Sequence, residues 1–398
     1  MPRKAILTLF GTRPEIIKLA PVLLQFERAD LVRTINVTSG QHAELLYPLI
    51  DLFNTRIDYD LRLMTPNQNS HLLLHRIVHE VTDILRRECP DLVVVQGDTT
   101  TALAGAIAAH RCGVPVAHVE AGLRSGNLRS PYPEEINRIS ITRLAAIHFA
   151  ATESNRSALR REGIPETAIF VTGNPIVDAL KLVLNKKNKA FGPDLKTALA
   201  APKCVVLTTH RRESFGPRLR RNFEVIRSFI EHHQDIVLVL PVHPNPHVKA
   251  PANEILAGHP RIVLTSPLCY VDFIHLLSKC WLAISDSGGV QEEVPSLGKP
   301  LLILREITER PECIAAGMAR LTGSGPEALW TMLEEACQED SWVNSVDRIA
   351  NPFGDGDSAR RIVKHCVDFL QGEANQCPLW RVSPVGDNFA SHFAQLSS

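Results

Sequence analysis

Residues able to do acid–base or anion chemistry gather directly after short apolar stretches of the chain. In the first half they begin the segments GDTTT at Gly97, EAGLR at Glu120 and EEINR at Glu134. In the second half they lie in THRRESFG from Thr209 and in SDSGGVQEE from Ser285. Carboxylates and histidine can move protons near neutral pH, and arginines can stabilise a departing anion. This inventory suits proton transfer beside a bound diphosphate, such as that of a nucleotide-diphosphate sugar.

The segment GTRPEIIK follows the first apolar stretch and predicts a sharp turn that opens a helix. Gly11 permits the turn, and Pro14 fits the first helical turn, where its missing N–H costs nothing. The N–H groups of that helix start, together with Arg13 and Lys18, could bind an anion. A capped helix with solvated cations is the alternative. Neither G-x-G-x-x-G nor a P-loop pattern occurs, which argues against a nicotinamide site and a P-loop.

Three carboxylates in the first half are candidate acids or bases. Asp98 follows an apolar stretch, where the commoner role of an aspartate is to cap a helix. Glu120 ends a wholly apolar stretch, and a buried charge there is costly unless it is paired or functional. Glu134 and Arg138 lie four residues apart, so they share one helix face and could pair.

Two histidines and an arginine follow apolar stretches in the second half. His210 and Arg211 come directly after the first of these stretches, and a solvated surface loop is the alternative interpretation. His243 lies in PVHPNP, whose three prolines predict a rigid loop that could aim the imidazole. We expect these side chains to reach a ligand at the strand ends.

The segment SDSGGVQEE predicts a cradle for a phosphate or diphosphate. Ser287, Gly288 and Gly289 would bring bare backbone N–H groups and a helix start towards the anion. Glu293 would lie on nearly the same helix face as Ser287, where it could bind sugar hydroxyls. Arg310, in REITERPE, would add a cation at the same rim.

Composition excludes several classes of protein. The 398 residues contain 43 Lys and Arg and 43 Asp and Glu, so no global positive field exists to gather nucleic acid or anionic membrane. No apolar run approaches the roughly 18 residues that span a bilayer. The nine cysteines form no C-x-x-C pair, which argues against a zinc cluster or a redox site. We therefore expect a soluble cytoplasmic protein.

Short β-branched runs alternate with longer amphipathic stretches, which is typical of doubly wound parallel sheets. Strands are expected over 5–10, 34–38, 92–96, 116–119, 147–150 and 169–171, and then over 204–208, 236–240, 262–264, 282–284 and 301–304. We expect one α/β domain over 1–178, a Lys-rich linker over 179–203 and a second α/β domain over 204–357. A helix over 358–371 and a mobile tail over 372–398 would follow. The carboxyl ends of both strand sets would surround one cleft, where open α/β sheets bind ligands.

Residue types and spacing leave the reaction open, because transferases, hydrolases and eliminating enzymes can all activate a diphosphate leaving group. Eight segments in this order resemble those of the non-hydrolysing UDP-N-acetylglucosamine 2-epimerases, over about residues 4 to 370. They are GTRPEIIKLAP, GDTTTALA, HVEAGLRSG, SPYPEEINR, THRRESFG, PVHPNP, SDSGGVQEEVPSLGKP and REITERPE.

The resemblance implies a GT-B fold, in which two Rossmann-like domains surround a deep cleft, and a homodimer. It implies interconversion of UDP-N-acetylglucosamine and UDP-N-acetylmannosamine without NAD or metal. In that mechanism UDP is eliminated to leave 2-acetamidoglucal, and it adds back after C2 is protonated on the other face.

The resemblance also assigns roles to residues, without deciding which carboxylate is acid and which is base. Acid–base candidates are Asp98, Glu120, Glu134 and His210, and Arg138 is a further catalytic residue. Substrate-binding candidates are Arg13, Lys18, Arg211, His243, Phe273, Ser287, Gly288, Gly289, Glu293 and Arg310. Among these, Glu293 matches the ribose contact and Phe273 matches the position that packs against uracil.

The chain departs from the family where many bacterial members bind a second UDP-N-acetylglucosamine as activator. A Q-H-R-x-M-L-like segment reads QHAELL from Gln41, and Asn67 stands where an arginine is expected. We therefore expect weak or absent activation by substrate.

Four other functions stay open. They are a UDP-sugar hydrolase that releases N-acetylmannosamine, a GT-B glycosyltransferase, a non-catalytic sugar-nucleotide sensor, and a 2-epimerase of a modified UDP-sugar. The intact GTRPE, THRRESFG and TERPE segments favour the non-hydrolysing branch.

Overall fold

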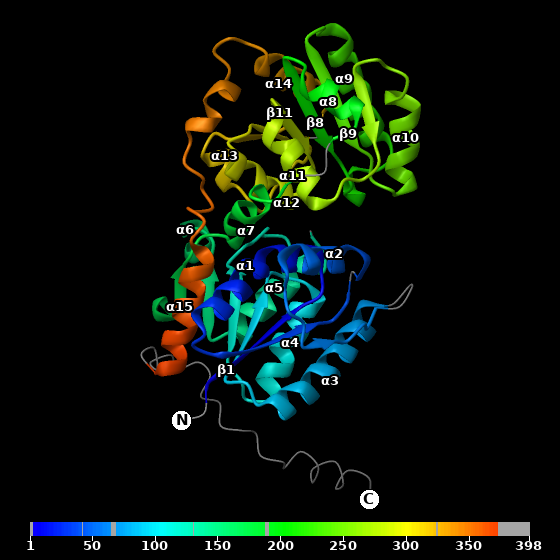
Figure 1. The fold of residues 1–398 in the computed structure, drawn as a ribbon. Coiled ribbons are helices and arrows are strands. Elements are labelled where there is room, and N and C mark those ends of the chain that lie inside the picture. Colours follow the sequence, from blue (N-terminus) through cyan, green and yellow to red (C-terminus); the bar gives the residue numbers. More distant parts are fainter. Residues whose placement is uncertain are drawn as a thin grey trace, which may run out of the picture. The chain divides into compact units, whose positions relative to one another are not determined.

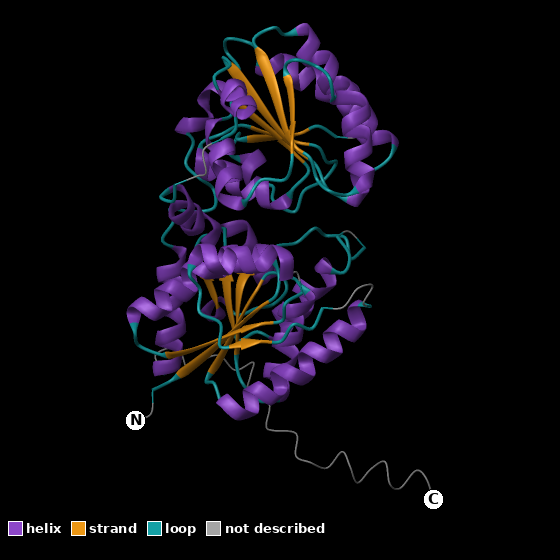
Figure 2. Cartoon of the chain, turned by 45° about the vertical axis from the view of Figure 1, so that its right-hand side comes forward, coloured by secondary structure: helices purple, strands orange, loops and turns teal. Residues whose placement is uncertain are grey.

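The computed structural model describes residues 3–41, 43–64, 69–129, 131–187, 191–323 and 325–372. The chain divides into two compact units, and residues Gly173–Ser358 form the second. The first unit contains the chain up to Thr172 and takes it up again at Ala359. Figures 1 and 2 show a central sheet with helices on both faces in each unit.

Within the described part of the first unit, seven strands form one sheet in the order β3-β2-β1-β4-β5-β6-β7. Every pair is parallel. The strands are β1 Ala5–Phe10, β2 Arg33–Thr38, β3 Tyr59–Asp60, β4 Leu92–Gln96, β5 Val116–Ala121, β6 Ile147–Ala150 and β7 Ile169–Val171. The central strands are buried throughout because helices cover both faces, which explains their continuous apolar runs. The two-residue strand β3 is not predicted, since so short a strand carries no periodicity.

The helices of the first unit fill the connections between its strands. They are α1 Arg13–Ala29, α2 Ala43–Phe53, α3 Ser70–Glu88, α4 Thr100–Arg111, α5 Glu134–Leu144 and α6 Glu153–Arg161, with a 3-10 turn at Glu166–Ala168. No helix among the described residues has the length and apolar character that a bilayer crossing requires.

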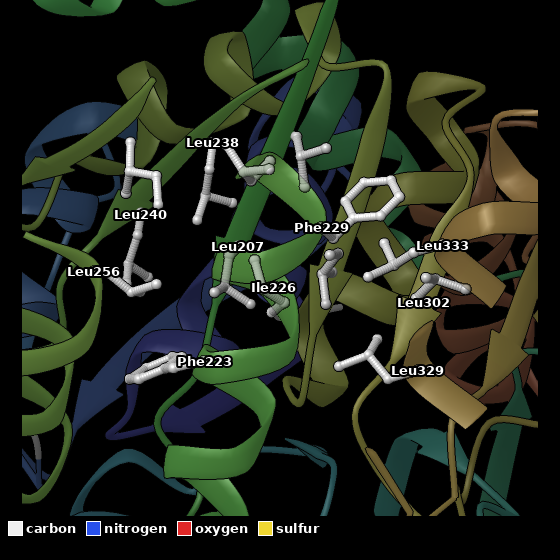
Figure 3. Close-up of a cluster of buried hydrophobic side chains, with 14 of the residues drawn as sticks. Leu207, Phe223, Ile226, Phe229, Leu238, Leu240, Leu256, Leu302, Leu329 and Leu333 are labelled. Carbon is white, nitrogen blue, oxygen red and sulfur yellow. The ribbon is translucent and has the colours of Figure 1, made fainter. Parts of the chain in front are cut away.

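In the second unit, counting the residues that the structure describes, six parallel strands have the order β10-β9-β8-β11-β12-β13. They are β8 Lys203–Thr208, β9 Ile236–Pro241, β10 Ile262–Thr265, β11 Leu282–Ser285, β12 Leu301–Ile303 and β13 Ala319–Leu321, the last of which is not predicted. The helices are α7 Pro175–Leu184, α8 Pro193–Leu199, α9 Pro217–His232, α10 Pro246–Leu256, α11 Tyr270–Lys279, α12 Gly288–Glu293, α13 Glu312–Ala315 and α14 Pro326–Ala336. Figure 3 shows Phe223 and Phe229 of α9 packed among leucines of the sheet and of α14.

The linker predicted over 179–203 is wrong. The described part of this stretch contains the end of α7 and all of α8, whose apolar side chains are buried in the second unit, Leu180 and Val183 among them. Each helix contains a single lysine, and the lysines between them, Lys186, Lys187 and Lys189, obscure the helical pattern in the sequence. The boundary lies at Gly173 instead of residue 178.

The predicted C-terminal helix is α15, Ser358–Gln371, and from Ala359 it belongs to the first unit. There the His365 ring stacks on Phe170 with centroids 4.1 Å apart. Residues 373–398, which hold almost all of the predicted tail, lie outside the described residues.

Both sheets have a topological switch point. The order changes direction between β1 and β4 in the first unit, and between β8 and β11 in the second. In open α/β sheets ligands bind outside the carboxyl ends of the strands at such points. The segments starting at Gly11, Gly97 and Thr209 follow three of these strands, and the segment starting at Ser285 begins on the last residue of β11.

Candidate active site

Glu120 lies inside a strand, not after its end as predicted. The pairing of β5 with β6 shifts register between Val119 and Ala121, so Glu120 is the extra residue of a β-bulge, with φ 64°. A left-handed conformation costs a non-glycine residue roughly 1–2 kcal/mol, and bulges next to active sites re-aim side chains. The strained backbone of Glu120 therefore indicates that the direction of its side chain is important for the site.

The Glu120 carboxylate is held as a buried anion. Lys18 Nζ from α1 lies 2.5 Å from its Oε1, and the Gln96 amide donates to its Oε2. The side chains of Lys18 and Glu120 are only 6% and 7% exposed. Each charge is largely removed from water and is therefore stabilised by the opposite charge of its partner.

Arg138 is buried between two carboxylates. Its Nε donates to Asp98 Oδ2 over 3.1 Å, its Nη2 contacts the same oxygen, and its Nη1 donates to Glu135 Oε2 over 2.8 Å. The Asn137 amide donates to the Asp98 backbone carbonyl over 2.8 Å. Helix α5 thus fixes both the backbone and the carboxylate of Asp98.

Glu134 differs from the other two acid–base candidates of this unit. It is half-buried at the first position of α5, and it has no hydrogen-bond or ion-pair partner among the described residues. A carboxylate without competing partners can accept or deliver a proton to a ligand more readily than one already paired.

Two backbone N–H groups directly before α1 have partners within the protein. The N–H groups of Gly11 and Thr12 donate to Glu15 Oε2 over 3.0 and 2.8 Å, so they are satisfied within the protein. Burial raises the pKa of Glu15 to about 7, although hydrogen bonds from Thr99, Thr12 and Gly11 each lower it. Arg13 is half-buried at the first position of α1.

In the second unit, Asp286 organises the loop after β8. Its buried carboxylate accepts from Thr209 Oγ1 at 2.7 Å and from the backbone N–H groups of His210 and Arg211 at 3.1 Å. His210 Nδ1 lies 3.4 Å from Asp286 Oδ1, and its side chain is 43% exposed. The predicted His243 stacks on His210 with ring centroids 5.9 Å apart. The two imidazoles therefore gather at adjacent strand ends.

Arginines surround the start of α12. A Cβ on Gly288 would lie 2.8 Å from Arg310 Nη1 and 3.3 Å from Arg211 Nη2, so a side chain here would displace the guanidinium groups. Arg310 Nη1 donates to Glu309 Oε1 over 2.6 Å, and Arg211 Nη2 lies 3.4 Å from the same oxygen. Burial opposes the charge on Glu309, but Arg310, Arg305 and Arg211 outweigh it and hold the Glu309 pKa well below its usual range.

Burial and the charge of Arg305 lower the pKa of Arg211 in this cluster. An anionic ligand would relieve this crowding of positive charge. The predicted cradle is partly occupied, because the Ser287 N–H donates to the Ser285 hydroxyl over 3.0 Å. Gly288 and Gly289 open α12 as predicted.

Glu293 and Phe273 lie on neighbouring helices of the second unit. The Tyr270 hydroxyl donates to Glu293 Oε1 over 2.9 Å and so links α11 to the end of α12. Phe273, three residues after Tyr270, is half-buried on α11. Residues three apart share a helix face, so Phe273 lies on the side of α11 that faces this link.

Several residues that hold the site are not predicted from the sequence. They are Glu15, Gln96, Glu135, Asp286 and Glu309. Each lies inside a predicted segment or beside it. Gln96 and Asp286 have distant partners, and Glu15 has the distant partner Thr99, so spacing gives no signal for these contacts. Glu135 and Glu309 pair with arginines three and one residues away, a spacing that the sequence does show. Among the described residues, no group of three His, Cys, Asp or Glu side chains could hold a metal ion.

Two parallel-sheet units with charged residues at their switch points define an enzyme of the two-domain Rossmann-like GT-B class. The family model described as UDP-N-acetylglucosamine 2-epimerase matches residues 25–366. The chain therefore belongs to the UDP-N-acetylglucosamine 2-epimerase family, and it is an enzyme of the epimerase type. This confirms the resemblance to the UDP-N-acetylglucosamine 2-epimerases and the fold class that the sequence predicts.

Individual relatives agree with this assignment. The UDP-N-acetylglucosamine 2-epimerase of Escherichia coli strain K12 is 40% identical over 368 residues, which cover 90% of this chain and 97% of the relative. S. aureus MnaA, solved with UDP, has a TM-score of 0.86 and 37% identity, covering 92% of this chain and 97% of that one. The Neisseria meningitidis enzyme bound to UDP-GlcNAc has a TM-score of 0.84 and 38% identity, covering 92% and 100%.

Proposed function

We propose that the protein is a non-hydrolysing epimerase that interconverts UDP-N-acetylglucosamine and UDP-N-acetylmannosamine. The observation that carries this proposal is the division of the charged residues into two sets. Carboxylates with different partners gather at the switch point of the first unit. Arginines crowd around a glycine helix start at the switch point of the second. The N. meningitidis relative binds UDP-GlcNAc, which supports this substrate.

The chemistry requires both sets. C2 of the sugar has no adjacent ketone, so removal of its proton alone is unfavourable. When a base takes the C2 proton, the C2–H electron pair forms the C1–C2 double bond. The C1–O pair then leaves with UDP. Arg211 and Arg310 would stabilise the departing diphosphate. Lys18 contacts the carboxylate of Glu120, and Arg138 contacts that of Asp98.

The reverse steps complete the exchange. An acid protonates C2 of 2-acetamidoglucal on the opposite face, and a UDP oxygen bonds again to C1. Glu134, without a partner in the described part of the chain, is the carboxylate best suited to exchange a proton with the sugar. Asp98 and Glu120 would serve as paired anions, and His210, oriented by Asp286, would assist proton transfer or bind the departing group.

One experiment tests this function. The protein is incubated with UDP-N-acetylglucosamine in deuterium oxide and followed by NMR. Formation of UDP-N-acetylmannosamine with deuterium at C2, without free sugar, is the expected result. Free N-acetylmannosamine with UDP would identify a hydrolase instead. No exchange with this substrate, together with exchange of a UDP-sugar modified at C3 or C6, would assign a different substrate.

A matched pair of variants separates chemistry from folding. Glu134→Gln should abolish deuterium incorporation while UDP binding, measured by calorimetry, stays within about threefold. Asp91→Asn, at the amino ends of the strands of the same sheet, should leave deuterium incorporation intact. We further propose that the enzyme is a cytoplasmic homodimer, as the family resemblance implies, and light scattering of the purified chain tests the dimer.

A further inference from the structure

We propose that Glu15 is a positioning residue for the epimerisation, because its buried carboxylate ties the turn that carries Arg13 to the turn that carries Asp98. This inference rests on the proposed function for its kinetic consequence, and on geometry for the rest. It concerns a residue that contacts neither of the paired carboxylates in the described structure, and whose partners hold the backbone beside them.

The carboxylate of Glu15 is fully buried and accepts four hydrogen bonds. Its Oε2 accepts from Gly11 N, Thr12 N and Thr12 Oγ1 over 3.0, 2.8 and 2.8 Å. Its Oε1 accepts from Thr99 Oγ1 over 2.6 Å, from a residue 84 positions along the chain. No Lys or Arg of the described chain pairs with Glu15, so hydrogen bonds alone compensate for burying the group.

Thr99 passes this restraint to the turn that carries Asp98. Its hydroxyl donates to Glu15, and the same oxygen accepts from Ala102 N over 3.0 Å as the N-cap of α4. The Thr99 hydroxyl therefore donates one hydrogen bond to α1 and accepts another from α4. A change at Glu15 would move Thr99, and Asp98 is the residue directly before it.

The same turn is held from two other directions. His118 Nε2 lies 2.7 Å from the carbonyl oxygen of Gly97, and the Asn137 amide donates to the carbonyl of Asp98 over 2.8 Å. Each of the three consecutive residues 97, 98 and 99 is thus tied to a different element. Glu15 supplies the tie to α1, the helix that also carries Lys18, the partner of Glu120.

Close packing leaves the joined turns little freedom. A Cβ on Gly11 would lie 1.9 Å from Ser39 Oγ and 2.7 Å from Thr101 Oγ1. Those two hydroxyls hydrogen-bond to each other over 2.8 Å. The turns after β1, β2 and β4 therefore form one connected unit, and a misplacement of about 1 Å in such a unit can cost about a hundredfold in rate.

The test compares Thr99→Val, which keeps the shape but removes the hydroxyl, with Thr99→Ser, which keeps the hydroxyl. We expect Thr99→Val to lower kcat at least about tenfold with KM changed less than about threefold, and Thr99→Ser to stay within about threefold of wild type. Glu15→Gln, whose amide must reverse the bond to Thr99, should lower kcat at least about threefold. The double variant should be no worse than Thr99→Val, because both changes break one connection.

Asp91→Asn is the matched control. Asp91 joins the same two strands at their other ends, where it accepts from Ala5 N over 2.8 Å and from Lys4 Nζ over 2.7 Å. The Asp91→Asn variant should be less stable than wild type, and its kcat should be unchanged. If Thr99→Val retains kcat as this control does, or if the two effects multiply in the double variant, the positioning role is overturned.

Crystal structures of the wild type and of Thr99→Val decide the matter without turnover. We expect the Asp98 carboxylate to move by about 1 Å from its place on Arg138 in the variant. An unmoved Asp98 would overturn the proposal. A wild-type enzyme that epimerises nothing would refute the proposed function instead, while this comparison would still test the role of Glu15.

Discussion

The stability of the protein should depend on pH through Glu15. Burial raises its pKa from 4.5 to about 7 in the folded state, against the effect of the hydrogen bonds from Thr99, Thr12 and Gly11. The folded state therefore binds this proton more tightly than the unfolded chain does. The resulting stabilisation is fully present below about pH 4.5 and is lost as pH rises through about 7. The full difference corresponds to about 3 kcal/mol at 1.36 kcal/mol for each pKa unit.

Glu15→Gln is the perturbation that isolates this effect, because glutamine has nearly the same shape and does not titrate. Urea unfolding followed by far-UV circular dichroism gives the free energy of unfolding of both proteins at about pH 5 and about pH 8. Between these values wild type should lose about 2.5 kcal/mol relative to the variant. Groups that titrate in both proteins cancel in this comparison.

A difference between the two proteins that stays constant with pH, within about 0.5 kcal/mol, would refute the reasoning. It would mean that the four hydrogen bonds fully offset burial and that Glu15 is ionised throughout. Carboxyl NMR of the labelled protein gives an independent check. A titration with a midpoint near pH 7 should be present in wild type and absent from Glu15→Gln.

Three further predictions concern the paired charges and the ligand sites. Lys18→Met should destabilise the protein by about 3–5 kcal/mol in urea unfolding, because it leaves the buried Glu120 carboxylate without its cation. An unchanged free energy of unfolding would show that the pair is not needed. Gly288→Ala should weaken UDP binding at least about tenfold in calorimetry, because its Cβ would lie 2.8 Å from Arg310. Gly289→Ala is the matched control, because its Cβ would approach nothing closer than 3.8 Å, and equal losses in both variants would contradict the argument. Initial rates should depend hyperbolically on UDP-N-acetylglucosamine, whereas clear sigmoidality would count against weak activation by substrate.

Part of the basis for that last expectation lies outside the described structure, because Asn67 and the side chain of Ala43 are not among the described parts of the chain. Gln41 is described, and its side-chain oxygen accepts from Thr101 Oγ1 over 2.9 Å. Its role in a second site therefore stays a prediction from the sequence.

Most of the architecture could be predicted from the sequence. A buried parallel strand is apolar on both faces, so 92–96 and 282–284 stand out as continuous runs bounded by turn residues. The predicted strands fail where the signal is short, as in β3 and β13. The predicted linker fails because the lysines that follow α7 obscure two short helices in the sequence. The positions of the site residues follow from the strands, since polar groups at carboxyl ends of parallel strands must gather at one edge.

What the sequence determined by itself is therefore the order of strands and helices, the residues at the strand ends and the family. These depend on local patterns of apolar, turn and charged residues. The tertiary structure alone decided the partners of those residues. Lys18 meets Glu120 from 102 positions away, and Thr99 meets Glu15 from 84. Such pairs form only when the sheet brings its strand ends together, and burial then gives each charge a specific partner and Glu15 its altered pKa.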